Sequence, residues 1–363
     1  MEAEILPAAG PLSPAMAADS PRPATAPSRL GAWLGLLRLE YQGNNLLAWF
    51  AATLLALPAG GFRADWFLGG LLMLLLAQCA LELLDGYHDF VQGAHPRKAI
   101  GEQRWTGGSG VLASGSVRPK LVERVAWTLG LLSGVCFVAV TIGRTGWVGL
   151  AVGLFGAVCG AGWAMPPLKL SYRGLGEPAI ALVAGPLMTA QAWLIARGQL
   201  DATALWLGVP LGLVELAMAM AHGMVDAQVD AQAGKRTLAV RLGPRASAQL
   251  HVFALVAAFA SLLLLVGTQV LPKLALLALL ALPLALRSAW VVLAAARDPQ
   301  RLPEVTRGFP GYGVHAVMGL GLVGAFAIKG SAAPYAPLVI AGFGLCYLPV
   351  GLTLLMRGSE GSP

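Results

Sequence analysis

Long apolar runs, each close to the length needed to cross a bilayer, restrict the fold of this chain more than any other feature. The runs are rich in Leu, Ala, Gly and Val, and a transmembrane helix needs about 20 such residues. They show no alternation of polar and apolar residues, so transmembrane strands are not indicated. Because backbone polar groups must be satisfied inside a bilayer, the runs predict an all-α, polytopic transmembrane bundle.

We expect nine to ten spans. The predicted segments are 44–61, 66–85, 121–142, 146–166, 177–197, 203–225, 246–270, 272–296, 312–329 and 335–356. Residues 1–28 are rich in Ala, Pro and Ser without an apolar period, which predicts a disordered segment. The transmembrane domain is assigned to residues 29–330, and residues 331–363 to an additional span with a short tail.

The placement of charge predicts the orientation of the bundle. A net charge of +7 would favour nucleic-acid binding in a soluble protein, but only 12% of these residues are charged. If the N-terminus is inside, the outer loops hold few of the basic residues, namely Arg63, Arg144, Arg197, Lys273 and Lys329. The positive-inside rule then makes the long loops 86–120, 226–245 and 297–311 cytoplasmic. We therefore expect a multi-pass protein of the inner (plasma) membrane, whose partner is the lipid bilayer and not nucleic acid.

An acidic pair follows the sixth predicted span. Asp226 and Asp230 are four residues apart, so on a helix their carboxylates share one face. Two carboxylates so placed repel each other unless a cation lies between them, and Mg²⁺ typically takes one or two carboxylates together with phosphate oxygens and water. Lys235 and Arg236 follow and could neutralise phosphate charge. The alternative interpretation is an ordinary solvated helix end.

A second acidic cluster ends the second predicted span. Glu82, Asp85 and Asp89 stand at positions i, i+3 and i+7, again on one helical face. Ionisable groups at the inward-facing end of a membrane helix are candidates for function. The alternative is that the two aspartates are interfacial and that Glu82 is neutral or paired. Both clusters leave even-numbered spans toward the same side, which favours a shared site.

Three motifs resemble those of a known family. The Asp226–Asp230 pair with the run 234–243, Gly-Lys-Arg-Thr-Leu-Ala-Val-Arg-Leu-Gly, resembles the second aspartate motif of the UbiA superfamily of intramembrane prenyltransferases. The stretch 166–177 resembles a loop of its menaquinone branch, the 1,4-dihydroxy-2-naphthoate polyprenyltransferases. Residues 100–115 also fit that branch.

This resemblance implies a helical bundle around a central cavity and an enzyme of isoprenoid metabolism. Such an enzyme transfers a polyprenyl group from its diphosphate to an aromatic acceptor, here a quinone precursor, with Mg²⁺ as cofactor. The implied catalytic residues are Asp89, Asp226 and Asp230, which would also be metal ligands, and we add Asp85 and Glu82 as candidate metal ligands of our own. The residues expected to bind diphosphate or acceptor are Arg38, Arg104, Tyr172, Arg173, Lys235 and Arg236.

The first aspartate motif departs from the family pattern. Asp85 stands where the family has Asn, Gly86 where it has its first Asp, and His95 where it has its third. Our hypothesis is that Glu82 and Asp85 compensate by moving the acidic face one turn deeper. Two other functions stay open: a UbiA-type terpene cyclase or a transferase with a non-quinone acceptor, and a non-enzymatic lipid-binding or transport protein.

Other polar residues lie in or beside the predicted spans. Buried polar groups are costly in a membrane, so Glu215 is expected to line the cavity or to pair, for which Arg287 is a candidate partner. Tyr172 and Glu177 could orient an acceptor ring, or could cap a loop.

Overall fold

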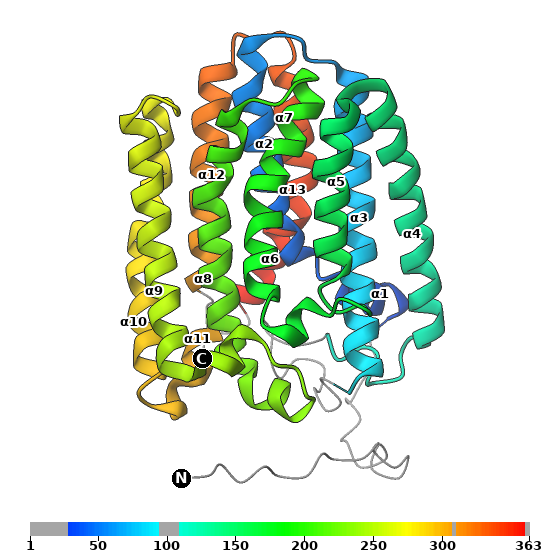
Figure 1. Ribbon diagram of the computed structural model, residues 1–363, viewed down its shortest axis with the longest axis vertical. Helices are drawn as coiled ribbons and strands as arrows, with labels where there is room; N and C mark the ends of the chain where they lie inside the picture. The colour runs from blue at the N-terminus through cyan, green and yellow to red at the C-terminus, as the bar shows by residue number, and fades with distance from the viewer. Residues whose placement is uncertain (1–27, 94–108, 307–309, 360–363) are drawn as a thin grey trace.

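The structure is a computed structural model that describes residues 28–93, 109–306 and 310–359, and helices form all of the regular secondary structure there (Figure 1). The α-helices are α1 Arg29–Leu37, α2 Leu39–Ala56, α3 Ala64–Val91, α4 Pro119–Val140, α5 Gly146–Ala161, α6 Gly176–Leu182, α7 Met188–Arg197, α8 Ala202–Gln232, α9 Leu238–Gly267, α10 Leu282–Ala295, α11 Leu302–Thr306, α12 Pro310–Gly330 and α13 Ala336–Ser359. Shorter helical turns are η2 Leu57–Ala59, η3 Thr141–Thr145, η4 Leu170–Arg173, η5 Val183–Leu187, η6 Lys273–Ala281 and η7 Pro299–Arg301. The prediction of an all-α bundle is confirmed.

Each predicted span coincides with a helix or with consecutive helical segments. The helices differ in length and in apolar composition. Within the described residues, 7 helical runs are long and apolar enough to cross a membrane. One of these runs, Pro119–Ala161, is interrupted at Gly146, whose φ of 58° lies in the left-handed region. The Phe137 ring of α4 reaches Gly153 of α5, where a Cβ would collide with it. The number of membrane spans stays a prediction.

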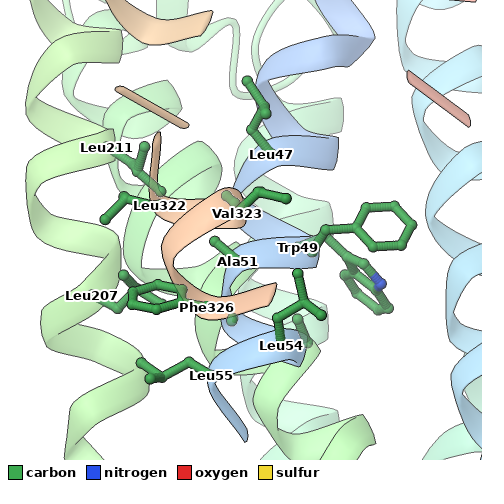
Figure 2. Close-up of a cluster of buried hydrophobic side chains, with 14 of the residues drawn as sticks. Leu47, Trp49, Ala51, Leu54, Leu55, Leu207, Leu211, Leu322, Val323 and Phe326 are labelled. Atoms are coloured by element: carbon green, nitrogen blue, oxygen red, sulfur yellow. The ribbon is translucent and has the colours of Figure 1, made fainter. Parts of the chain in front are cut away.

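Helix α2 forms the centre of the bundle. Its Leu47 and Leu54 are fully buried, and Figure 2 shows this helix facing α8 and α12, which contribute Leu211 and Phe326. The outer helices instead expose large apolar side chains, as Trp147 of α5 does. An apolar exterior around an apolar centre is the pattern that a lipid solvent allows.

The helices α8 and η5 approach each other through glycine. A Cβ at Gly208 would lie 2.4 Å from the Pro186 nitrogen and 2.5 Å from the Gly185 carbonyl carbon. These obstacles are backbone or ring atoms, which have little freedom to move. Small residues at such crossings let membrane helices pack closely.

Gly208→Val is therefore expected to destabilise the protein by about 1–3 kcal/mol, as overpacking of a close contact typically does. The measurement is the thermal unfolding midpoint in detergent. Gly134→Val in α4 is the matched control, because a Cβ at Gly134 meets nothing within 4 Å. Equal shifts for the two variants would show that the loss comes from helix propensity and not from the α8–η5 contact.

Candidate active site

A cavity of about 280 Å³ lies among α1, α2, α3, α5, α6, η5 and α8. It contains both predicted acidic clusters: its lining includes Glu82, Asp85, Asp89, Asp226 and Asp230. Arg38 and Lys235 line it as well. Residues that are more than 100 positions apart in the chain thus meet in one site, as the sequence pattern predicted.

Both acidic clusters lie on helices, because α3 and α8 each continue beyond the end of their apolar run. Helix α8 extends through Asp226 and Asp230 to Gln232, and α3 extends through Asp89 to Val91. Both helices end at the lower end of the bundle in Figure 1. The i and i+4 spacing therefore places the Asp226 and Asp230 side chains on the same face of α8, the face that lines the cavity.

Lys235 connects the two clusters directly. It follows the tight turn at Gly234, whose φ is 72°, and its Nζ lies 3.2 Å from Oδ2 and 3.4 Å from Oδ1 of Asp89. The two side chains are only 8% and 10% exposed. Burial alone would lower the pKa of Lys235, but Asp89, Asp85 and Asp230 outweigh it and raise the pKa. The ammonium group is therefore charged at neutral pH.

Arg38 adds a second cation to the cavity. It stands between α1 and α2 with a φ of 44°, and its guanidinium lies 4.1 Å from the centroid of the Tyr41 ring. Arg38 Nη1 is 3.7 Å from Oε2 of Glu82. The carboxylate of Glu82 thus has a basic neighbour, and its role as a metal ligand stays a prediction.

The carboxylates that line the cavity fit a hard divalent cation. Asp85 Oδ1 and Asp230 Oδ1 are buried and have no hydrogen-bond partner among the residues that the structure describes, and a buried oxygen without a partner is costly unless a ligand is bound. Within the described residues, no group of three or more His, Cys, Asp or Glu side chains is arranged to hold a metal by itself. Mg²⁺ usually takes one or two protein carboxylates and completes its coordination with phosphate oxygens and water.

Gly86 leaves room in the first cluster. It lines the cavity, and a Cβ there would meet nothing within 4 Å. The family's first Asp would stand at this position, so the departure removes a carboxylate without filling its space.

Three other predicted binding residues, Tyr172, Arg173 and Arg236, are not among the described residues that line the cavity. Tyr172 packs its ring 5.8 Å from Lys235 Nζ, and burial together with Asp89 raises the pKa of Tyr172 to about 12, so its phenol is protonated at neutral pH. Arg173 donates to the Pro167 carbonyl at 2.9 Å, and Arg236 is exposed. Arg104 lies outside the described residues. Binding roles for these four residues stay predictions.

Glu177 caps helix α9. The carboxylate is 3% exposed, and its Oε1 accepts hydrogen bonds from the backbone N–H groups of Leu238 at 2.8 Å and Ala239 at 3.4 Å. A carboxylate at a helix N-terminus satisfies free N–H donors and interacts favourably with the helix dipole. Of the two roles predicted for Glu177, the structure supports loop capping. The 166–177 stretch is thereby fixed to the segment that carries Lys235.

Glu177→Ala is expected to lower the unfolding midpoint, because losing a cap costs about 1 kcal/mol of stability. It should also lower the rate of catalysis at the cavity, because Glu177 lines the cavity and holds the segment that carries Lys235. Glu177→Gln retains an acceptor oxygen and should have a smaller effect. Asp201→Ala is the control, since Asp201 caps α8 through the Thr203 N–H at 2.7 Å and does not line the cavity. If both caps affect stability alike and neither affects kinetics, Glu177 does not position the site.

Of the two alternatives for Glu215, lining of the cavity is confirmed, and the candidate pairing with Arg287 is wrong. Arg287 is exposed, whereas Glu215 Oε2 accepts a hydrogen bond from Asn44 Nδ2 at 2.9 Å and lies 3.8 Å from His315 Nε2. Sequence reasoning missed Asn44 and His315. In the sequence, Asn44 and His315 are polar residues in otherwise apolar segments. Such a pattern is typical of a buried polar residue, but it does not predict which helices face each other.

The fold and the cavity define a polytopic membrane protein with two carboxylate clusters gathered at one end of its helical bundle. The model of the UbiA prenyltransferase family matches residues 46–304. Because this match covers most of the chain, the protein belongs to the UbiA prenyltransferase family.

Individual relatives are distant. The 1,4-dihydroxy-2-naphthoate octaprenyltransferase of Bacillus subtilis (strain 168) is 23% identical over 187 residues, which cover 51% of this chain and 57% of the relative. UbiA prenyltransferase domain-containing protein 1 of Xenopus tropicalis is 28% identical over 214 residues, which cover 56% of this chain and 59% of the relative. The chain therefore spans little more than half the length of these two relatives.

Solved structures share the fold. A UbiA homolog from Archaeoglobus fulgidus bound to GPP and Mg²⁺ superposes with a TM-score of 0.52 at 12% identity, over 81% of this chain and 99% of that one.

Proposed function

We propose that the protein is an integral-membrane prenyltransferase that moves a polyprenyl group from its diphosphate to an aromatic acceptor of the quinone-precursor type. The observation that carries this proposal is the meeting of Asp85, Asp89, Asp226, Asp230 and Lys235 around one cavity. The names of the relatives and the GPP and Mg²⁺ in the structural neighbour support it. We assign the transfer to residues 29–330, with 331–363 as an additional span.

The chain's own residues divide the work in this proposal. Asp85, Asp89, Asp226 and Asp230, with Glu82 beside them, would hold Mg²⁺, which when bound supplies charge neutralisation for the leaving diphosphate. Lys235 and Arg38 offer donors to the diphosphate oxygens. The carbon–oxygen bond to the diphosphate breaks, and the diphosphate leaves with the bonding electron pair. A ring carbon of the acceptor then bonds to the allylic carbon, and the proton of that ring carbon passes to a carboxylate of the cavity. The apolar part of the cavity keeps water from the allylic cation.

The proposed location is the inner (plasma) membrane, with the acidic end of the cavity toward the cytoplasm. The uneven distribution of Lys and Arg between the two sets of loops supports this orientation.

The test is product analysis with the full chain in nanodiscs. Labelled geranyl diphosphate and 1,4-dihydroxy-2-naphthoic acid are supplied with Mg²⁺ or with EDTA, and prenylated ring and free diphosphate are measured. We expect Mg²⁺-dependent formation of prenylated ring. A cyclic hydrocarbon formed without acceptor would instead identify a terpene cyclase, and binding of geranyl diphosphate without release of diphosphate would identify a lipid-binding or transport protein.

A separate prediction tests whether Glu82 and Asp85 compensate for the aspartates that the first motif lacks. Asp85→Ala and Glu82→Ala are each expected to weaken Mg²⁺-dependent binding of geranyl diphosphate roughly 10- to 100-fold, the range typical of disturbed metal sites. Calorimetric titration measures this affinity. Glu123→Ala in α4 is the control, because Glu123 does not line the cavity. If both variants bind as the unaltered protein does, these two residues do not compensate for the missing aspartates.

A further inference from the structure

A group of polar side chains lies in the cavity wall far from the aspartates. Glu215 of α8 is 7% exposed, Asn44 of α2 is 3% exposed, and His315 of α12 is fully buried behind them. Asn44 donates to Glu215, and both residues line the cavity together with Asn45. Carboxyl and amide groups are costly within a membrane bundle, so this group is not explained by packing alone.

Helix α8 relates this group to the aspartates. Its cavity-lining face carries Glu215, Met218, Ala219, His222, Gly223, Asp226 and Asp230. Glu215 and Asp226 are separated by three helical turns, so they share one face about 16 Å apart along the axis. That separation leaves room for a metal-bound diphosphate and one ring system in a row.

The two walls of the cavity differ in chemistry. The wall formed by α5, η5 and the part of α6 that follows Glu177 is apolar and includes Cys159, Gly160, Ile180, Val183 and Ala184. Helix α3 adds Leu81, but also Gln78 and the acidic cluster. The wall formed by α2 and α8 carries the polar group. A hydrocarbon tail gains free energy along the apolar wall and would leave the groups of the other wall without hydrogen bonds. The polar wall therefore fits a different part of the substrate pair.

The unpaired atoms of the two asparagines at this level are hydrogen-bond acceptors. Asn44 Oδ1 and Asn45 Oδ1 are buried and have no hydrogen-bond partner among the described residues, and the Asn44 Nδ2 donor is already directed to Glu215. The two ring nitrogens of His315, which does not line the cavity, also lack a hydrogen-bond partner there. The Glu215 carboxyl adds further acceptor oxygen to the same wall. A ligand that satisfies these atoms must donate hydrogen bonds, as a ring hydroxyl does. A ligand carboxylate placed here would meet acceptor oxygens instead.

We propose that Glu215, with Asn44 and Asn45, forms the acceptor subsite and binds a hydroxyl group of a phenolic ring. This assignment rests on the proposed prenyl transfer and narrows its acceptor to a hydroxylated ring. The hydroxyl faces the inner end of the cavity, and any carboxylate on the ring is directed away from Glu215.

The experiment measures equilibrium binding of 1,4-dihydroxynaphthalene and of 1,4-dimethoxynaphthalene to the full chain in nanodiscs under anaerobic conditions. Quenching of tryptophan fluorescence reports binding, because Trp163 lines the cavity. We expect the unaltered protein to prefer the dihydroxy compound about tenfold or more, as a hydrogen bond to a charged or strongly polar group allows. Glu215→Leu should abolish this preference and Glu215→Gln should reduce it.

Two parallel measurements separate the possible failures. Ser133→Ala in α4 removes a buried hydroxyl that bonds to the Met73 carbonyl outside the cavity, and it should keep the preference. Mg²⁺-dependent binding of geranyl diphosphate is measured for every variant and should survive in both Glu215 variants. The subsite is overturned if Glu215→Leu still prefers the dihydroxy over the dimethoxy compound as strongly as the unaltered protein does. It is also overturned if the Glu215 variants lose geranyl diphosphate binding together with ring binding. Absence of geranyl diphosphate binding in the unaltered protein overturns the proposed function instead.

Discussion

Asp226→Asn is expected to lower kcat/KM for prenyl transfer roughly 1,000-fold. The substitution keeps the size of the side chain and the helix, but it removes a negative charge from the α8 face that lines the cavity. Each factor of ten corresponds to about 1.4 kcal/mol of transition-state stabilisation, and a catalytic metal contributes several kcal/mol. Initial rates of transfer in nanodiscs, measured over a titration of Mg²⁺, provide the test.

The control for this variant is Asp298→Asn. Asp298 caps the short turn η7 through the Gln300 N–H at 3.0 Å and does not line the cavity. We expect its rates to equal those of the unaltered protein. A loss of less than tenfold for Asp226→Asn, with the Mg²⁺ dependence unchanged, would remove Asp226 from the metal site.

Lys235→Met is expected to reduce the transfer rate about 100-fold and to destabilise the metal-free protein. The ammonium group balances Asp89 in a pair that is almost fully buried, and removing one partner of such a pair typically costs 3–5 kcal/mol. The carboxylates of Asp85 and Asp230 would then repel Asp89 more strongly. Added Mg²⁺ should therefore raise the unfolding midpoint more in this variant than in the unaltered protein.

A double-mutant cycle with Asp89→Asn tests whether this effect comes from the pair. Side chains in direct contact usually show a coupling energy of about 0.5–3 kcal/mol, whereas independent sites are additive. Additive losses of stability would contradict the direct role of the Lys235–Asp89 contact. Lys235→Arg keeps the charge and should retain most of the stability.

The sequence was sufficient for the fold class and for the acidic faces. Apolar runs of membrane length specify helices whatever their neighbours are, and the helical period alone fixes that Asp226 and Asp230 share a face. It was less informative about helix ends. The apolar run of α8 stops near residue 225, whereas the helix continues to Gln232, because a polar turn can remain helical without being apolar.

The partners of buried polar residues could not be predicted in this way. Lys235 and Asp89 are 146 residues apart, and Glu215 and Asn44 are 171 residues apart, so each pairing depends on which helix faces meet. Loop side chains raise the same difficulty. The direction of Arg173 depends on the left-handed turns at Lys169 and Gly174, which spacing in the sequence does not specify.

Because one continuous helix carries Glu215 and Asp226, their separation cannot change without bending α8. The length of the acceptor ring system that fits would then be set by where the polar residue stands along α8, and not by a conformational change. Each helical turn adds about 5.4 Å, so a relative that prenylates a ring system longer by about that length should carry its polar residue one turn nearer the N-terminal end of α8. Selectivity in this family could thus diverge through the exchange of two residues on a single face of α8.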